Sequence, residues 1–138
     1  MSDIKIGWQV GLKHMPFEKV LAWAESVKVQ TLELGGWPKD AHTDVDKILS
    51  GSATQLKGLI EQHHLKAESI GYCVNHLDRN AKLKQERKEH MYKVIDAAQM
   101  MEIPIVACFV GGMGGGLFEN MAAVEEDFIP ILEHARDH

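Results

Sequence analysis

Four short apolar segments of the chain alternate with four longer stretches in which apolar residues recur at helical spacing. The short segments are residues 4–10, 31–34, 67–74 and 105–110, each bounded by Gly, Pro or polar residues. A strict strand–helix alternation favours an α/β fold, with parallel strands joined by outer helices. Four βα units form either half of a (β/α)8 barrel or a small open sheet, and the pattern leaves this choice open.

The predicted helices each carry one apolar face. Pro16 begins the first helix, because the first helical position tolerates a missing N–H. Ser52 is the expected N-cap of the second helix and Asn120 that of the last, while the third spans about 81–101. No linker interrupts the pattern, so residues 1–138 are expected to form a single domain.

Composition excludes several function classes. Hydrophobic residues make up 45% and charged residues 25% of the chain, and the net charge is −5 without a basic face, which disfavours nucleic-acid binding. No apolar run approaches the roughly 18 residues of a membrane helix. The N-terminus lacks a signal-peptide pattern, and Cys73 and Cys108 are expected to be reduced core residues. A cytoplasmic location is therefore expected.

Glu33 is a carboxylate inside an apolar strand, between Leu32 and Leu34. A buried carboxylate must be paired, hydrogen-bonded or protonated, because burying a bare charge is costly. One interpretation is a site residue that holds a metal-bound water, a sugar hydroxyl or a ligand histidine. The other is a structural residue of a barrel interior, paired with a lysine such as Lys5.

His76 follows the third predicted strand and precedes Asp78. Its imidazole is suited to binding a divalent metal or transferring a proton near neutral pH, although a hydrogen-bonded surface histidine is the alternative. Adjacent residues His63 and His64 would point about 100° apart on a helix and could not easily share a metal. Surface positions are expected for the remaining histidines: His14, His42, His90, His134 and His138.

A run of glycines, 111–116, follows the fourth predicted strand. It lacks the Lys-Ser/Thr of a P-loop and the glycine order of a dinucleotide-binding motif. Its backbone amides are suited to a phosphate or hydroxyl at the start of the last helix, and the alternative is a flexible connection.

Several segments together resemble the sugar isomerase/epimerase superfamily with the xylose-isomerase-like TIM barrel. The matching segments are TLELGGWP, AESIGYCVNHLD, VIDAAQMMEIPIVACFVGG and FENMAAVEEDFIPILEHARDH, so the resemblance covers nearly the whole chain. It implies a (β/α)8 barrel that isomerises or epimerises sugars, sugar phosphates or related polyols, often with a divalent metal such as Mn²⁺, Zn²⁺ or Mg²⁺.

The resemblance also implies roles for individual residues. Glu33 would be a catalytic glutamate facing the barrel mouth, and His76 a catalytic or metal-binding histidine. The remaining residues would bind the sugar, either as apolar surface or through polar and backbone groups: Trp8, Trp37, Asn75, Phe109, Gly111 and Gly112.

The chain departs from the family pattern in length. In this family, most metal ligands and acid/base residues come from strands five to eight, and a TIM barrel needs about 250 residues. We therefore expect the N-terminal half of such a barrel, ending at His138 before the fifth strand, with little or no activity of its own. One alternative is a non-catalytic half-barrel that forms a homodimer through its open sheet edges or binds a small polyol or phosphate ligand. Another is a flavodoxin-like open sheet that binds a phosphate ligand.

Overall fold

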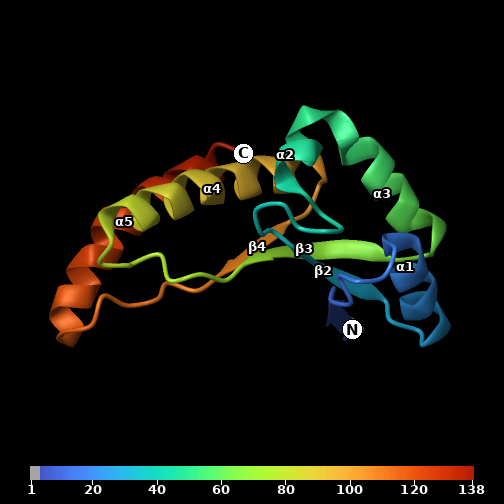
Figure 1. Ribbon diagram of the computed structural model, residues 1–138, viewed down its shortest axis with the longest axis horizontal. Coiled ribbons are helices and arrows are strands. Elements are labelled where there is room, and N and C mark those ends of the chain that lie inside the picture. The colour runs from blue at the N-terminus through green and yellow to red at the C-terminus, as the bar shows by residue number, and fades with distance from the viewer. Residues whose placement is uncertain (1–3) are drawn as a thin grey trace.

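The computed structural model describes residues 4–138 and contains a single sheet of four parallel strands (Figure 1). The strands lie side by side in chain order: β1 (Gly7–Gln9), β2 (Thr31–Gly35), β3 (Lys66–Tyr72) and β4 (Ile105–Cys108). The predicted four βα units and parallel pairing are confirmed. A sequential strand order excludes the flavodoxin-like sheet, in which the order of strands reverses partway along the sheet.

Helices follow each strand, as the alternation predicts. They are α1 (Phe17–Ser26), α2 (Val45–Lys47), α3 (Ala53–Gln62), α4 (Ala81–Met100) and α5 (Leu117–Arg136), with a turn η1 (Ile48–Ser52) before α3 that is kinked at Gly51 (φ +117°). Ser52 is the N-cap of α3, as predicted, but its side chain makes no capping hydrogen bond because the chain enters α3 directly from η1. The predicted N-cap Asn120 is wrong, since Asn120 lies inside α5, whose N-cap is Gly116.

The two edge strands are shorter than predicted. β1 begins at Gly7 rather than residue 4, and Ile4 is 94% exposed. β4 ends at Cys108, although the apolar run continues to Val110. An edge strand has a neighbour on one side only, so fewer of its residues find pairing partners. The predicted third strand, 67–74, lies at Lys66–Tyr72 instead.

The core lies between one face of the sheet and the helices. Leu32, Leu34 and Ile70 are fully buried on this helix-covered face, together with Leu21 of α1 and Val94 of α4. Successive strand residues point to opposite faces, so the residues between them project the other way. We call that opposite surface the inner face, because it is the face that a closed barrel would enclose.

Apolar side chains are also exposed at the β4 end of the structure. Ile105 and Phe109 are exposed on and just after β4, and α5 adds further examples, with Phe118 84% exposed. Neither cysteine lies in the core: Cys73 is half-buried and Cys108 is exposed, and both are free thiols. No helix within residues 4–138 is long and apolar enough to cross a membrane.

Candidate functional site

Three polar side chains from three neighbouring strands form a hydrogen-bonded row across the inner face. Gln9 Nε2 donates to Glu33 Oε1 at 3.0 Å, and Ser69 Oγ donates to Glu33 Oε2 at 2.9 Å. The strand register aligns Gln9 with Glu33 and Glu33 with Ser69. Each carboxylate oxygen therefore has one fixed partner and retains lone-pair capacity for a further hydrogen bond.

A β-bulge determines which residue of β3 faces Glu33. Leu32 pairs with Ala67, but the next residue, Glu33, pairs with Ser69, because the register shifts between Leu32 and Glu33. Without this shift Glu68 would lie opposite Glu33, and two like charges would oppose one another. The predicted pairing of Glu33 with Lys5 is wrong, since Lys5 lies 3.6 Å from Glu68 and the partners of Glu33 are neutral.

Small residues leave space beside the Glu33 carboxylate. Gly71 follows Ser69 on the same face, and a Cβ atom there would lie 3.1 Å from Glu33 Oε1. Cys73 comes next, and burial together with the charge of Glu33 raises the pKa of its thiol. An open hollow of about 280 Å³ borders the row and extends toward the starts of β1 and β2; its lining residues are Gly7, Trp8, Gln9, Thr31, Leu32, Glu33, Glu68 and Ser69. Its size is close to that of a small-molecule site.

His76 lies elsewhere, enclosed by the helix layer. It is 3% exposed, and its ring contacts Tyr72 and Phe128 edge-on, with centroid distances of 5.6 Å to each. Neither ring nitrogen forms a well-aligned hydrogen bond. Burial, aided by the Arg87 charge, lowers the pKa of His76 despite the opposing effect of the Tyr72 carbonyl. A surface position for His76 is wrong, because α5 covers it, and it shares no partner with Glu33.

His90 is also buried, contrary to its expected surface position. Its Nε2 donates to the Gly36 carbonyl at 2.7 Å, and its ring lies against Tyr72 at 4.7 Å. The charged residues around it in the sequence obscure its inward orientation. His90 therefore has a structural partner and is not part of the candidate site.

Asn75 fixes the glycine loop instead of projecting freely from it. Its Nδ2 donates to the Gly112 carbonyl and its Oδ1 accepts from the Gly112 N–H, both at 2.9 Å. Gly111 has a φ of +82°, and a Cβ there would overlap Asn75 Oδ1. Further loop amides donate to side chains of α5, at Asn120 and Glu119. The loop is thus a fixed connection, not a flexible one, and the amides of Gly112, Met113 and Gly116 are occupied.

The three aromatic residues expected to line a sugar site lie apart. Trp8 contacts Trp23 of α1 edge-on at 4.9 Å and packs against the core, on the other side of β1 from Gln9. Trp37 covers Tyr72 at 5.6 Å and is partly exposed. Phe109 is 64% exposed just beyond β4. Trp8 therefore contributes to packing and also borders the hollow beside Glu33, whereas Trp37 and Phe109 remain accessible but do not line that hollow.

Asp40 is a buried charged residue that the sequence pattern did not single out. Its Oδ2 lies 2.7 Å from Lys13 Nζ, and Oδ1 accepts from the N–H groups of His42 and Thr43 at 3.0 and 3.3 Å. Burial opposes ionisation, but Lys13 and the two N–H groups outweigh it and lower the pKa of Asp40. The pair connects the loops that follow β1 and β2.

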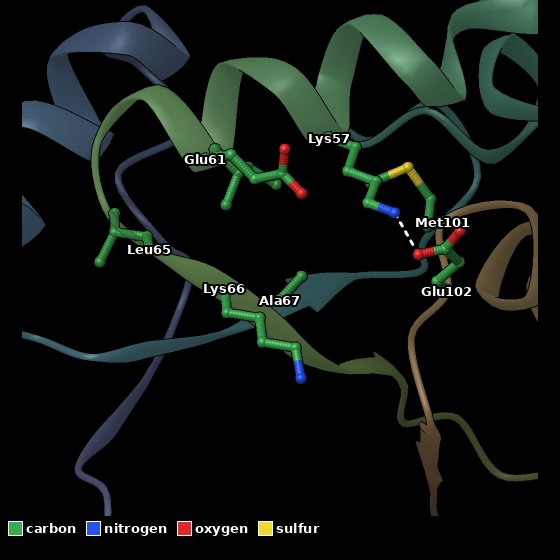
Figure 2. A pocket seen from close by; sticks show the side chains of 8 residues that line it. Lys57, Glu61, Leu65, Lys66, Ala67, Met101 and Glu102 are labelled. Atoms are coloured by element: carbon green, nitrogen blue, oxygen red, sulfur yellow. Dashed lines mark hydrogen bonds and ion pairs between the residues drawn. The ribbon is translucent and has the colours of Figure 1, made fainter.

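A second hollow, of about 320 Å³, lies at the start of β3 between α3 and the end of α4 (Figure 2). Lys57 and Glu102 are ion-paired across it, and Lys66 points along its open side. Parallel βα folds bind ligands beyond the carboxyl ends of their strands, which is the opposite end of β3. We therefore exclude this hollow from the candidate site.

The inner face lacks a complete set of metal ligands. Within residues 4–138, no group of three His, Cys, Asp or Glu ligand atoms converges with Glu33. The described residues therefore do not fit the divalent metal that the family resemblance implies inside the barrel. In the described part of the chain, the one converging group is Asp96 of α4, His134 of α5 and His138 just beyond α5.

Comparisons with known proteins support the fold. No family model matches the chain. It is 26% identical over 109 residues to the uncharacterized protein YfiH of Bacillus subtilis (strain 168), covering 76% of this chain and 34% of that protein. Among solved structures, it resembles a xylose isomerase domain protein from Planctomyces limnophilus, with a TM-score of 0.69, 14% identity, and coverage of 96% of this chain and 50% of that one.

Two further structures give the same result. A D-psicose 3-epimerase, in the presence of D-fructose, has a TM-score of 0.69 at 9% identity, with coverage of 97% of this chain and 49% of that one. The probable 3-DHS dehydratase AsbF of Bacillus anthracis has a TM-score of 0.68 at 13% identity, with coverage of 95% and 49%. The chain thus spans about a third of its curated relative and half of these structures. At these low identities the comparison concerns the fold alone. It confirms the predicted half-barrel and its similarity in fold to xylose-isomerase-like barrels.

Proposed function

We propose that this chain, which has the fold of half a xylose-isomerase-like barrel, forms the first four units of an enzyme that isomerises or epimerises sugars or related polyols. The observation that carries the proposal is the row Gln9–Glu33–Ser69, which holds a carboxylate on the inner face. The sugar-active and related enzymes among the structural neighbours support the substrate class.

Glu33 is the group that we propose to contact substrate. Sugar hydroxyls are donors that a carboxylate can accept, and the side-chain carbonyl of Gln9 and the hydroxyl of Ser69 add acceptors beside it. Epimerisation next to a carbonyl requires a base on one side of the carbon and a proton donor on the other. Glu33 can occupy one side, and the second group must come from outside these four units, because His76 is enclosed by helices.

An NMR titration of the ¹⁵N-labelled chain with D-fructose tests this proposal. We expect shifts that concentrate on the amides of Gln9, Glu33, Ser69 and Gly71 and disappear in Glu33→Gln, whose amide cannot accept both hydrogen bonds. Glu18→Gln is the matched control, because Glu18 is an exposed carboxylate in the first turn of α1, away from the row. Shifts that persist in Glu33→Gln, or that appear only at the glycine loop, would contradict the proposal.

A second candidate is a non-catalytic half-barrel that self-associates. Association with a second copy is favoured by the apolar side chains exposed at the β4 edge and on α5, because burying them in an interface would remove them from water. These side chains are Ile105, Phe109, Phe118 and Leu132. Two copies related by two-fold symmetry could pair β4 of each copy with β1 of the other and close eight strands.

Light scattering tests self-association. We expect twice the 15.4 kDa chain mass at micromolar concentration, and the single-chain mass in Ile105→Lys. Val27→Lys is the control, since Val27 has similar exposure but lies at the end of α1. A wild-type chain that stays monomeric over the whole concentration range would rule out this second function.

A further inference from the structure

His134 of α5, His138 just beyond the end of α5 and Asp96 of α4 converge on the outer side of the helix layer. α4 and α5 run side by side, with the chain end meeting α4 (Figure 1). His134 Nε2 lies 2.6 Å from Asp96 Oδ1, and His138 Nε2 lies 3.4 Å from the same oxygen. One ligand atom from each of the three residues lies within 4.8 Å of the others.

The spacing of the histidines explains their convergence. Residues four apart lie on the same side of a helix, and the two imidazole centroids are 4.3 Å apart. α5 ends at Arg136, but Asp137 keeps helical backbone angles (φ −82°, ψ −5°), so His138 remains in line with His134. This i, i+4 arrangement is the one by which helices commonly present two imidazoles to a metal.

Two contacts besides Asp96 orient His138. Its Nδ1–H donates to the His134 carbonyl at 2.9 Å, which places the lone pair on Nε2, the atom that faces Asp96. Gln99 Nε2 of α4 donates to the backbone carbonyl of His138 at 3.0 Å. Metal-binding histidines commonly donate their second ring N–H to a carbonyl or carboxylate in this way, which fixes the tautomer.

We propose that Asp96, His134 and His138 bind a Zn²⁺ ion that links α4 to α5 on the outer surface of the helix layer. Two imidazoles and one carboxylate are a common zinc ligand set, with water as a fourth ligand. The site is independent of the proposed sugar function, since Glu33 lies on the inner face of the sheet. Without metal, His134 Nε2–H donates to Asp96, so binding of the ion through Nε2 requires the imidazole to carry its proton on Nδ1 instead.

The chain contains a matched group that lacks this convergence. His63 and His64 also approach one carboxylate, with His63 Nδ1 3.0 Å and His64 Nε2 3.9 Å from different oxygens of Glu25. Their side chains diverge because the residues are adjacent. This group provides two histidines and a carboxylate without a common centre.

Isothermal titration of the tag-free chain with ZnCl₂ at pH 7 tests the proposal. We expect one ion per chain and a higher melting temperature in the presence of zinc. MgCl₂ should give no binding, because imidazole ligands favour zinc over magnesium.

Variants separate this site from general histidine binding. His138→Ala, at the end of the chain and outside α5, should weaken zinc binding at least tenfold without loss of helical circular dichroism, and Asp96→Asn should do the same. His63→Ala should leave the affinity unchanged. Absence of zinc binding, equal binding of Mg²⁺, or an affinity insensitive to His138→Ala would overturn the proposal.

Discussion

His76 and Phe128 meet edge to face with ring centroids 5.6 Å apart, so that a residue of α5 separates the imidazole after β3 from water. Tyr72 closes the other side at the same distance. Burial lowers the pKa of His76, with the Arg87 charge adding to this effect. The folded chain consequently holds this ring in its neutral form near neutral pH.

This enclosure predicts a pH-dependent stability. The unfolded chain has the ordinary His76 pKa near 6.5 and the folded chain a lower one, so the unfolded state binds more protons below about pH 6.5. The contribution of His76 to the free energy of unfolding is present above this pH and decreases below it, by at most about 1.4 kcal/mol per pH unit. Urea unfolding between pH 7.5 and 5.5 measures the slope. His76→Leu should flatten it and His14→Leu, at an exposed position, should not; equal slopes in both variants would contradict the prediction.

Gly111→Ala should destabilise the chain by about 1–3 kcal/mol. The residue has a left-handed φ, and an added Cβ overlaps the Asn75 side chain that holds the loop. Gly58→Ala is the control, because Gly58 lies in α3 with open space around it and should stabilise by about 0.5–1 kcal/mol. Thermal or urea unfolding compares the two, and a neutral Gly111→Ala would show that the loop is not fixed as described.

Glu33 and Ser69 should be energetically coupled. A double-mutant cycle with Glu33→Ala and Ser69→Ala should give a coupling of about 0.5–1.5 kcal/mol, the usual net contribution of one hydrogen bond. Urea denaturation supplies the four free energies of unfolding. A cycle that uses Glu18→Ala in place of Glu33→Ala should show no coupling with Ser69→Ala, because Glu18 lies in the first turn of α1, away from the row. Additive effects of Glu33→Ala and Ser69→Ala would mean that the row does not form in solution.

Asp40 should contribute to acid unfolding. Its folded pKa lies below the ordinary 3.8, because Lys13 and two backbone N–H groups outweigh burial, so its stabilisation is present above about pH 4 and lost as the pH falls through the lower folded value. Asp40→Asn should lower the free energy of unfolding at pH 7. It should also reduce how steeply this free energy falls between pH 5 and 2, as measured by urea unfolding. Asp46→Asn, at an exposed ion pair, should cost much less stability at pH 7. Equal costs for the two variants would contradict the importance of burial at Asp40.

The fold was largely predictable because strand–helix alternation is a local pattern. The limits of β1 and β4 were not predictable. Ile4 and Phe109 are residue types that favour strands, but they lie outside the segments that pair with a neighbouring strand. Burial of His90 was also hidden, because its acceptor, the Gly36 carbonyl, lies 54 residues away.

The candidate site was predictable only in part. Glu33 stands out in the sequence as a carboxylate between two leucines, and Gln9 as a polar residue at a strand end. Ser69 could not be chosen over Glu68 as the partner of Glu33, because the choice depends on a bulge that strand composition does not reveal. Convergence of Asp96 with His134 and His138 depends on how α4 packs against α5, which sequence spacing alone does not specify. The i, i+4 spacing of the two histidines was nevertheless visible in the sequence.

The division of the sheet into a helix-packed face and an inner face has a consequence for how such a chain can change over time. Folding depends mainly on side chains such as Leu32, Leu34 and Ile70, which point away from the hollow. Recognition would depend on the alternate positions, such as Gln9, Glu33 and Ser69, which contribute little to the core. Selection can therefore exchange residues on one face to alter the preferred molecule while the other face continues to maintain the scaffold.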